Sequence, residues 1–196
     1  MLATPTQDYR KTEFKSPKEP LKGLDAFVHG IFGVYHRRSQ LLGHLGSEVE
    51  KIDAQAADWK SLPDHSLHER LMEFREGFTR GGQKVDALLR PALAAIREAA
   101  DRHLGLRPFP VQLLGALALH RGYLAEMATG EGKTLTAGLA AVLAGWTKRP
   151  CHIITVNDYL VVRDADWLRP LYTFCGVRVG CVTAAMEPAE RQKGYG

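Results

Sequence analysis

Apolar residues in the first half of the chain recur at intervals of three and four, which is the period of an α-helix. This pattern runs through Leu24–Tyr35, begins again at Leu67, and returns in Pro91–Leu104, whose proline is expected in the first helical turn. We expect Gly81–Gly82 to end the second helix and Gly105 to cap the third, because glycine readily takes the left-handed conformation found after helices.

The second half of the chain alternates short apolar runs with longer helical segments. Strands are expected at Tyr123–Met127, His152–Val156 and Val177–Thr183, and helices at Lys133–Trp146 and Asp158–Phe174. Strands that alternate with helices in this way predict a parallel sheet with right-handed crossovers. The fold class is therefore expected to be α/β.

Three regions are expected along the chain. Residues 1–22 are rich in proline and charge and are expected to form a mobile leader. Residues 23–105 are expected to be helical, and residues 106–196 to form an α/β domain. Pro188–Lys193 is expected to begin one more helix, after which the sequence stops, so this domain is expected to be incomplete.

The composition is that of an ordinary soluble globular protein, with 45% hydrophobic residues, 24% charged residues and a net charge of +4. So mild a positive charge is weak support for a nucleic-acid partner. The polar start of the chain lacks the apolar segment of a secretory signal. The longest uncharged apolar run, Leu135–Trp146, is shorter than the ~20 residues that cross a bilayer. We therefore expect a cytoplasmic protein.

The Leu24–Tyr35 helix has two interpretations. Its apolar face can pack into a protein core, which is the commoner arrangement, or it can lie on a membrane surface or on a partner. The basic residues His36–Arg38 follow directly and are compatible with contact at an anionic membrane surface.

The cysteine and histidine patterns do not predict a metal site. Cys151, Cys175 and Cys181 form no CxxC pair, and two of them lie in apolar runs, where buried thiols in a reducing compartment are expected. His65 and His68 are three residues apart, but no further ligands lie near them in the sequence. These two histidines are expected at the surface.

The sequence EMATGEGKTLTAG at residues 126–138 is typical of a phosphate-binding loop between a strand and a helix. Gly130 and Gly132 allow backbone N–H groups to approach phosphate oxygens closely. The helix expected to begin at Lys133 adds free N–H groups and the positive end of its dipole. Met127 occupies the first position of the GxxxxGK[ST] pattern, so the strict pattern is not met.

Two residues of this loop are the candidates for catalysis. Lys133 is expected to place its charge on the β- and γ-phosphates of ATP, and the Thr134 hydroxyl is expected to bind Mg²⁺. Glu131 lies between the two glycines and belongs to the same loop. Upstream, Gln112 is a candidate for binding the adenine edge, since its amide carries both a donor and an acceptor.

Hydrolysis of ATP at such a loop also needs an acidic group at the end of a later strand, which orients the metal and the attacking water. Asp158 follows an apolar run one strand later and is one candidate. Glu187 is another, but the neighbouring Pro188 is typical of a loop. No Asp-Glu pair follows an apolar run, so the acid is expected beyond Gly196.

Four segments resemble the first motor domain of SecA, the ATPase that drives preproteins through the SecY channel of bacteria. They are EFREGF at 73–78, IREAADRHLGLRPFPVQLLG at 96–115, AEMATGEGKTLTA at 125–137 and TVNDYLVVRDADWL at 155–168. The last is the most diagnostic. Pro108 and Pro110 depart from the family's pattern, which affects the expected local shape.

The resemblance implies an incomplete P-loop (RecA-like) motor domain at residues 106–196, with ATP and Mg²⁺ as cofactors. It implies that Gln112 contacts adenine and that residues 130–134 hold the phosphates. Asp158, Arg163 and Asp164 match a family motif, but helix capping and a local ion pair explain them as well. The implied partners are a SecY-type channel and preproteins, at the cytoplasmic face of the inner membrane, with no nucleic acid.

Two other functions are compatible with these motifs. A nucleic-acid helicase of the same motor superfamily uses a similar glutamine and loop, although the segment at 155–168 favours the translocase. A chain that folds alone would instead be a nucleotide-binding module. Because the acidic pair and a second motor domain are absent from these 196 residues, we expect the isolated chain to bind nucleotide weakly and to hydrolyse little ATP.

Overall fold

The computed structural model describes residues 41–82, 84–148 and 150–195. The predicted leader at 1–22 and the predicted helix Leu24–Tyr35 lie outside these residues. Residues 41–196 form one unit with its own hydrophobic core. The division of the chain at residues 22 and 105 stays a prediction.

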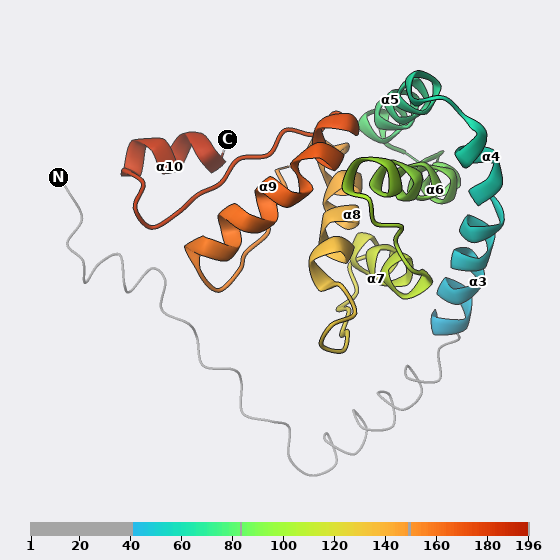
Figure 1. Ribbon diagram of the computed structural model, residues 1–196, viewed down its shortest axis with the longest axis horizontal. Coiled ribbons are helices and arrows are strands. Elements are labelled where there is room, and N and C mark those ends of the chain that lie inside the picture. The colour runs from blue at the N-terminus through green and yellow to red at the C-terminus, as the bar shows by residue number, and fades with distance from the viewer. Residues whose placement is uncertain (1–40, 83, 149, 196) are drawn as a thin grey trace, which may run out of the picture. The chain divides into compact units, whose positions relative to one another are not determined.

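Eight helices lie in the described part of the chain (Figure 1). They are α3 (Leu41–Ala54), α4 (Ala56–Ser61), α5 (Asp64–Arg80), α6 (Lys84–Leu104), α7 (Pro110–His120), α8 (Lys133–Gly145), α9 (Asp158–Phe174) and α10 (Pro188–Tyr195). The predicted helices at 133–146 and 158–174 are confirmed to within one residue. Asn157 caps α9, since its side chain accepts a hydrogen bond from the Leu160 N–H at 2.9 Å.

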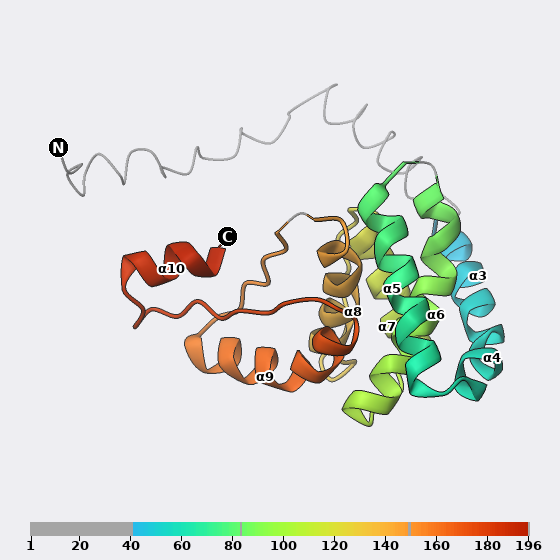
Figure 2. The ribbon, with the colours of Figure 1, turned by 90° about the horizontal axis from the view of Figure 1, so that it is seen from above.

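Helix α6 is the centre of the core and contacts α3, α4, α5, α8 and α9. Leu93, Ile96 and Ala100 on its predicted apolar stripe are fully buried. The predicted start at Pro91 is wrong, because α6 begins at Lys84 and carries the proline inside it. The extra turns are stabilised by packing: α5 and α6 run side by side (Figure 2), and Leu88 of α6 lies directly over Gly77 of α5.

Helix α7 was not predicted from the sequence, and it packs closely against α8. A Cβ atom added to Gly115 of α7 would lie 2.7 Å from Cγ2 of Thr136 in α8. A Cβ atom added to Gly138 would lie 2.9 Å from Leu168 of α9. These glycines let the three helices approach closely, which brings α7 beside the first turns of α8.

The three predicted strands, 123–127, 152–156 and 177–183, are irregular in the described chain, where no residue is assigned to a strand. Apolar side chains of the first two segments face solvent, with Leu124 97%, Ile154 92% and Val156 88% exposed, whereas Val177 and Val179 of the third are partly buried against the core. Their backbone groups therefore lack the neighbouring strands whose hydrogen bonds would define a sheet. The predicted α/β class is not confirmed at the level of the sheet.

Two buried cysteines were expected, and one of the three cysteines is buried. Cys175 is buried, Cys181 is partly buried and Cys151 is exposed, and all three are free thiols. Burial raises the pKa of the Cys175 thiol well above its usual range, which keeps it protonated. His65 is exposed as expected, whereas His68 is partly buried and donates from Nδ1 to the Phe174 carbonyl at 3.0 Å.

Two other histidines make stability depend on pH. Burial lowers the pKa of His103, which stacks on Phe174 at 3.9 Å between ring centroids, and of His120, which packs edge-on to Phe78. Because the unfolded chain binds protons at these histidines more readily, their contribution to the free energy of unfolding is complete above the ordinary pKa of about 6.5. It falls as the pH drops below that value.

We expect a lower urea midpoint at pH 5.5 than at pH 7.5 by tryptophan fluorescence. His120→Gln should reduce this difference, and an unchanged difference would contradict the assignment to His120.

Candidate functional site

The loop before α8 has the backbone shape of an anion-binding site. Gly130 has φ 89° and Gly132 has φ 86°, both in the left-handed region that favours glycine. The loop lies at the end of α8 where that helix begins (Figure 1), and Gly132 is the residue that caps it. The first N–H groups of a helix have no acceptor within the helix and point outward along its axis. The chain therefore presents these N–H groups at the concave side of a glycine turn.

The side chains of the predicted loop make contacts within the loop itself. Lys133 is exposed and Thr134 is partly buried, both in the first turn of α8. The Lys133 ammonium donates to the Ala128 carbonyl at 2.8 Å, and the Glu131 carboxylate accepts from the Ala128 N–H at 2.8 Å. These contacts hold the loop in a closed turn around the position of the lysine.

Met127, which departs from the strict glycine pattern, has a packing role. Its sulfur would lie 3.4 Å from a Cβ atom added to Gly115 of α7. The methionine therefore anchors the start of the loop against α7, where a glycine would leave space.

Gln112 lies in α7, is only 6% exposed and reaches the loop directly. Its Oε1 accepts from the Phe109 N–H at 2.9 Å, and its Nε2 donates to the Glu131 carbonyl at 2.9 Å. The amide nitrogen also lies where a Cβ atom of Gly132 would stand. A primary amide has two N–H donors and two acceptor lone pairs, so these two contacts use half of its hydrogen-bonding capacity.

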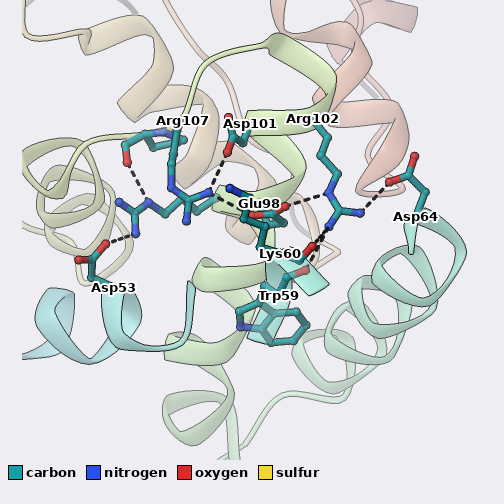
Figure 3. A network of polar contacts seen from close by, with 10 residues as sticks. Asp53, Trp59, Lys60, Asp64, Glu98, Asp101, Arg102 and Arg107 are labelled. Carbon is teal, nitrogen blue, oxygen red and sulfur yellow. Dashed lines mark hydrogen bonds and ion pairs between the residues drawn. The ribbon is translucent and has the colours of Figure 1, made fainter. Parts of the chain in front are cut away.

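A network of charged residues on α6 holds the connection that leads into α7 (Figure 3). Glu98, only 4% exposed, accepts from Arg102 Nε at 2.9 Å and from Arg107 Nη1 at 3.1 Å. Arg107 also donates to Asp101 at 2.8 Å, and Arg102 donates to Asp64 at 2.7 Å. Sequence analysis did not identify this network, although all of its members except Asp64 fall in the segment 96–115. The network ties the start of α7, and with it Gln112, to the helical core.

The chain matches the family described as the SecA DEAD-like domain over residues 30–196. It belongs to the SecA family. It is 46% identical over 191 residues to Protein translocase subunit SecA 2 of Chlorobium chlorochromatii, covering 97% of this chain and 29% of that protein. It is 45% identical over 172 residues to Protein translocase subunit SecA of Coxiella burnetii, covering 88% of this chain and 18% of that protein.

A third relative is a chloroplast protein, and this chain again covers only a small part of it. Protein translocase subunit SecA, chloroplastic, of Ostreococcus lucimarinus is 47% identical over 150 residues, covering 76% of this chain and 16% of that protein. This SecA-family chain therefore spans less than a third of the length of these curated relatives. No helix among the described residues is long and apolar enough to pass through a bilayer.

The two acidic candidates have structural partners in this SecA-family chain. Asp158 accepts from the Ala184 N–H at 2.9 Å and so ties the start of α9 to the segment after residue 177. Glu187 directly precedes α10, and its carbonyl accepts from the Glu190 and Arg191 N–H groups at 3.0 Å. Neither residue belongs to a cluster of three or more potential metal ligands in the part of the chain that the structure describes.

The motif at 155–168 has a local structural explanation. Arg163 donates from Nη2 to Asp164 at 2.6 Å, which is the expected local ion pair. Asn157 caps α9, and Asp158 stands in the first helical turn, where a negative charge is favourable. These contacts define and stabilise the first turns of α9.

Proposed function

We propose that this chain is the nucleotide-binding part of a SecA-type motor. In this proposal the motor couples ATP binding and hydrolysis to the movement of preproteins through a SecY-type channel, at the cytoplasmic face of the membrane. The observation that carries the proposal is the contact between Gln112 and the glycine loop at the start of α8, in a chain of this family.

The chemistry of the loop suits a nucleoside triphosphate. Residues Gly130–Thr134 offer backbone N–H groups, a helix dipole and one ammonium group to phosphate oxygens. The free donor and lone pair of Gln112 suit the adenine edge, which pairs an amino donor with a ring acceptor. The loop and the glutamine thus account for the two ends of ATP.

The loop also suits Mg²⁺ held jointly with the nucleotide. The Thr134 hydroxyl is the protein ligand that the loop supplies, and the remaining ligands would be phosphate oxygens and water. Bound there, Mg²⁺ would neutralise charge that develops on the phosphates. Lys133 shares this role from the other side of the loop, because its ammonium need only leave the Ala128 carbonyl to reach a phosphate.

We infer that the sheet of a RecA-like domain forms once the remaining sequence of a longer protein is present. The exposed apolar side chains at 123–127 and 152–156 support this inference, since they are the residues that a sheet would cover. The acidic pair that orients water would come from the same remaining sequence.

The proposal is tested by what stimulates ATP hydrolysis by the native full-length protein. Inverted membrane vesicles that carry the SecY-type channel, supplied with a preprotein, should raise the rate several-fold. RNA and single-stranded DNA should leave it unchanged. Stimulation by nucleic acid without any response to vesicles and preprotein would instead identify a helicase.

Gly132→Ala should weaken binding of Mg·ATP strongly. Alanine at this position would have to adopt φ 86°, in the left-handed region that favours glycine. Its Cβ would also displace the Gln112 amide from its place against the loop. Left-handed strain alone costs about 1–3 kcal/mol. We expect at least a tenfold higher Kd by calorimetry. Gly43→Ala, in α3 and with open space around its Cβ position, is the matched control and should bind normally; equal binding by both variants would count against the loop as the site.

A further inference from the structure

Arg97 in α6 is a buried cation with no contact to the glycine loop itself. It is 6% exposed and makes two polar contacts, an ion pair from Nη1 to Asp53 of α3 and a hydrogen bond from Nε to the Pro108 carbonyl at 2.9 Å. The Asp53 carboxylate neutralises the positive charge of this arginine by forming an ion pair with it. The second contact reaches into the connection between α6 and α7.

That second contact fixes one end of a single peptide group. The Pro108 carbonyl and the Phe109 N–H belong to the same peptide plane, and the plane is rigid. The N–H at the other end donates to Gln112 Oε1 at 2.9 Å. A contact that orients the Pro108 carbonyl therefore also orients the Phe109 N–H, which is the donor to the Gln112 amide. Hydrogen bonds linked through one peptide group also polarise and strengthen each other.

The contacts form one continuous path from α3 to the glycine loop. It runs from Asp53 to Arg97, through the 108–109 peptide to Gln112, and from Gln112 Nε2 to the Glu131 carbonyl. The preceding residue, Arg107, is held separately by Glu98 and Asp101. The path holds the glutamine amide in a single orientation, and these contacts use one of its two N–H donors and one of its two lone pairs.

We propose that Arg97 is a positioning residue that sets how well the site distinguishes adenine from guanine. This inference rests on the proposed role of Gln112 in binding the adenine edge. Adenine carries an amino donor at position 6 where guanine carries a carbonyl acceptor, so discrimination depends on which way the amide faces. Arg97 acts on the base only through the peptide plane and Gln112.

The test compares Kd values for Mg·ATP and Mg·GTP in the native full-length protein, by competition with a fluorescent nucleotide. Arg97→Lys keeps the charge, but a lysine has one nitrogen and cannot contact Asp53 and the Pro108 carbonyl as the guanidinium fork does. We expect the preference for ATP over GTP to fall about 3- to 10-fold, the effect of one lost hydrogen bond. Gln112→Ala should lower it at least as much, and adding Arg97→Lys to Gln112→Ala should change it no further.

Arg90→Lys is the matched control. It makes the same substitution on the same helix, at an arginine whose ion pair is with Glu48 of α3, so it should leave the preference for ATP unchanged. If Arg97→Lys fails to fold, Phe109→Pro provides the second test. Proline suits φ −75° at this position and deletes the N–H that Gln112 accepts. Its preference for ATP should fall in the same range.

Three results would overturn the inference. A normal preference in Arg97→Lys or Phe109→Pro, with a reduced one in Gln112→Ala, would make Arg97 a purely structural residue and leave the proposed function standing. A normal preference in Gln112→Ala would remove the adenine role of that glutamine, and the role of Arg97 with it. An additive effect of Arg97→Lys in the Gln112→Ala protein would show that the arginine acts by another route.

Discussion

Lys133→Ala should lower ATP hydrolysis by the native full-length protein about 10²–10³-fold, the usual effect of removing a group that stabilises transition-state charge. The ammonium stands in the first turn of α8, where the helix dipole and the N–H groups of the loop converge. Its hydrogen bond to the Ala128 carbonyl shows that the side chain lies across the loop. The variant should fold normally, because this side chain is exposed.

The control for this experiment is Lys60→Ala, which removes the same charge from an exposed position on α4. Steady-state phosphate release measures both variants, with and without vesicles and preprotein. Turnover by Lys133→Ala within a factor of two of the unmodified protein would exclude this loop as the site of hydrolysis.

Glu98→Ala should be the most destabilising substitution in the charged network. It would leave Arg102 and Arg107 without the buried carboxylate that accepts from both. Breaking a buried ion pair by removing one partner costs about 3–5 kcal/mol. Hydrogen exchange of α6 amides in the native protein measures this locally, and their protection should fall by at least 100-fold.

Glu73→Ala is the matched control, because it removes a carboxylate whose pair with Arg70 is exposed on both sides. Such surface pairs contribute about 0–1 kcal/mol, so protection of α6 should barely change. If Glu98→Ala left α6 as protected as Glu73→Ala does, the network would not be what stabilises α6.

The helices with a clear apolar period were predictable from the sequence, and those held by tertiary contacts were not. Both ends of helix α9 were predicted correctly, and Asn157 and Gly176 lie next to these ends. Helix α7 has apolar residues on most of its faces, and its place depends on close packing of Gly115 against α8. The start of α6 was misplaced because proline usually marks a first turn, whereas packing of Leu88 against α5 extends this helix past it.

The three predicted strands show that an apolar pattern alone does not determine a sheet. Short apolar runs at 123–127 and 152–156 are typical of buried strands, but a strand also needs neighbours that pair with it. Those neighbours are lacking among the described residues, and the side chains lie exposed instead. An apolar pattern of this kind therefore shows that a segment is suited to a buried strand, but it does not show that the segment pairs with other strands.

The glycine loop of the candidate site was predictable, because glycines and a lysine at a helix start have few other uses. Gln112 was a candidate for the adenine edge from its amide chemistry and from the family resemblance, but its position against the loop was not predicted. The contacts that hold it there, from Arg97 through the 108–109 peptide, join residues that are distant in sequence and carry no local pattern.

The most direct measurement is photolabelling of the native full-length protein with 8-azido-ATP, followed by peptide mapping. The label should fall on the peptide around Phe109–Gln112, beside the free positions of the Gln112 amide, and excess Mg·ATP should abolish it. Gln112→Ala should reduce the labelling while leaving the fold intact. A label that maps outside residues 105–135 and is displaced by Mg·ATP would contradict the assignment of the nucleotide site.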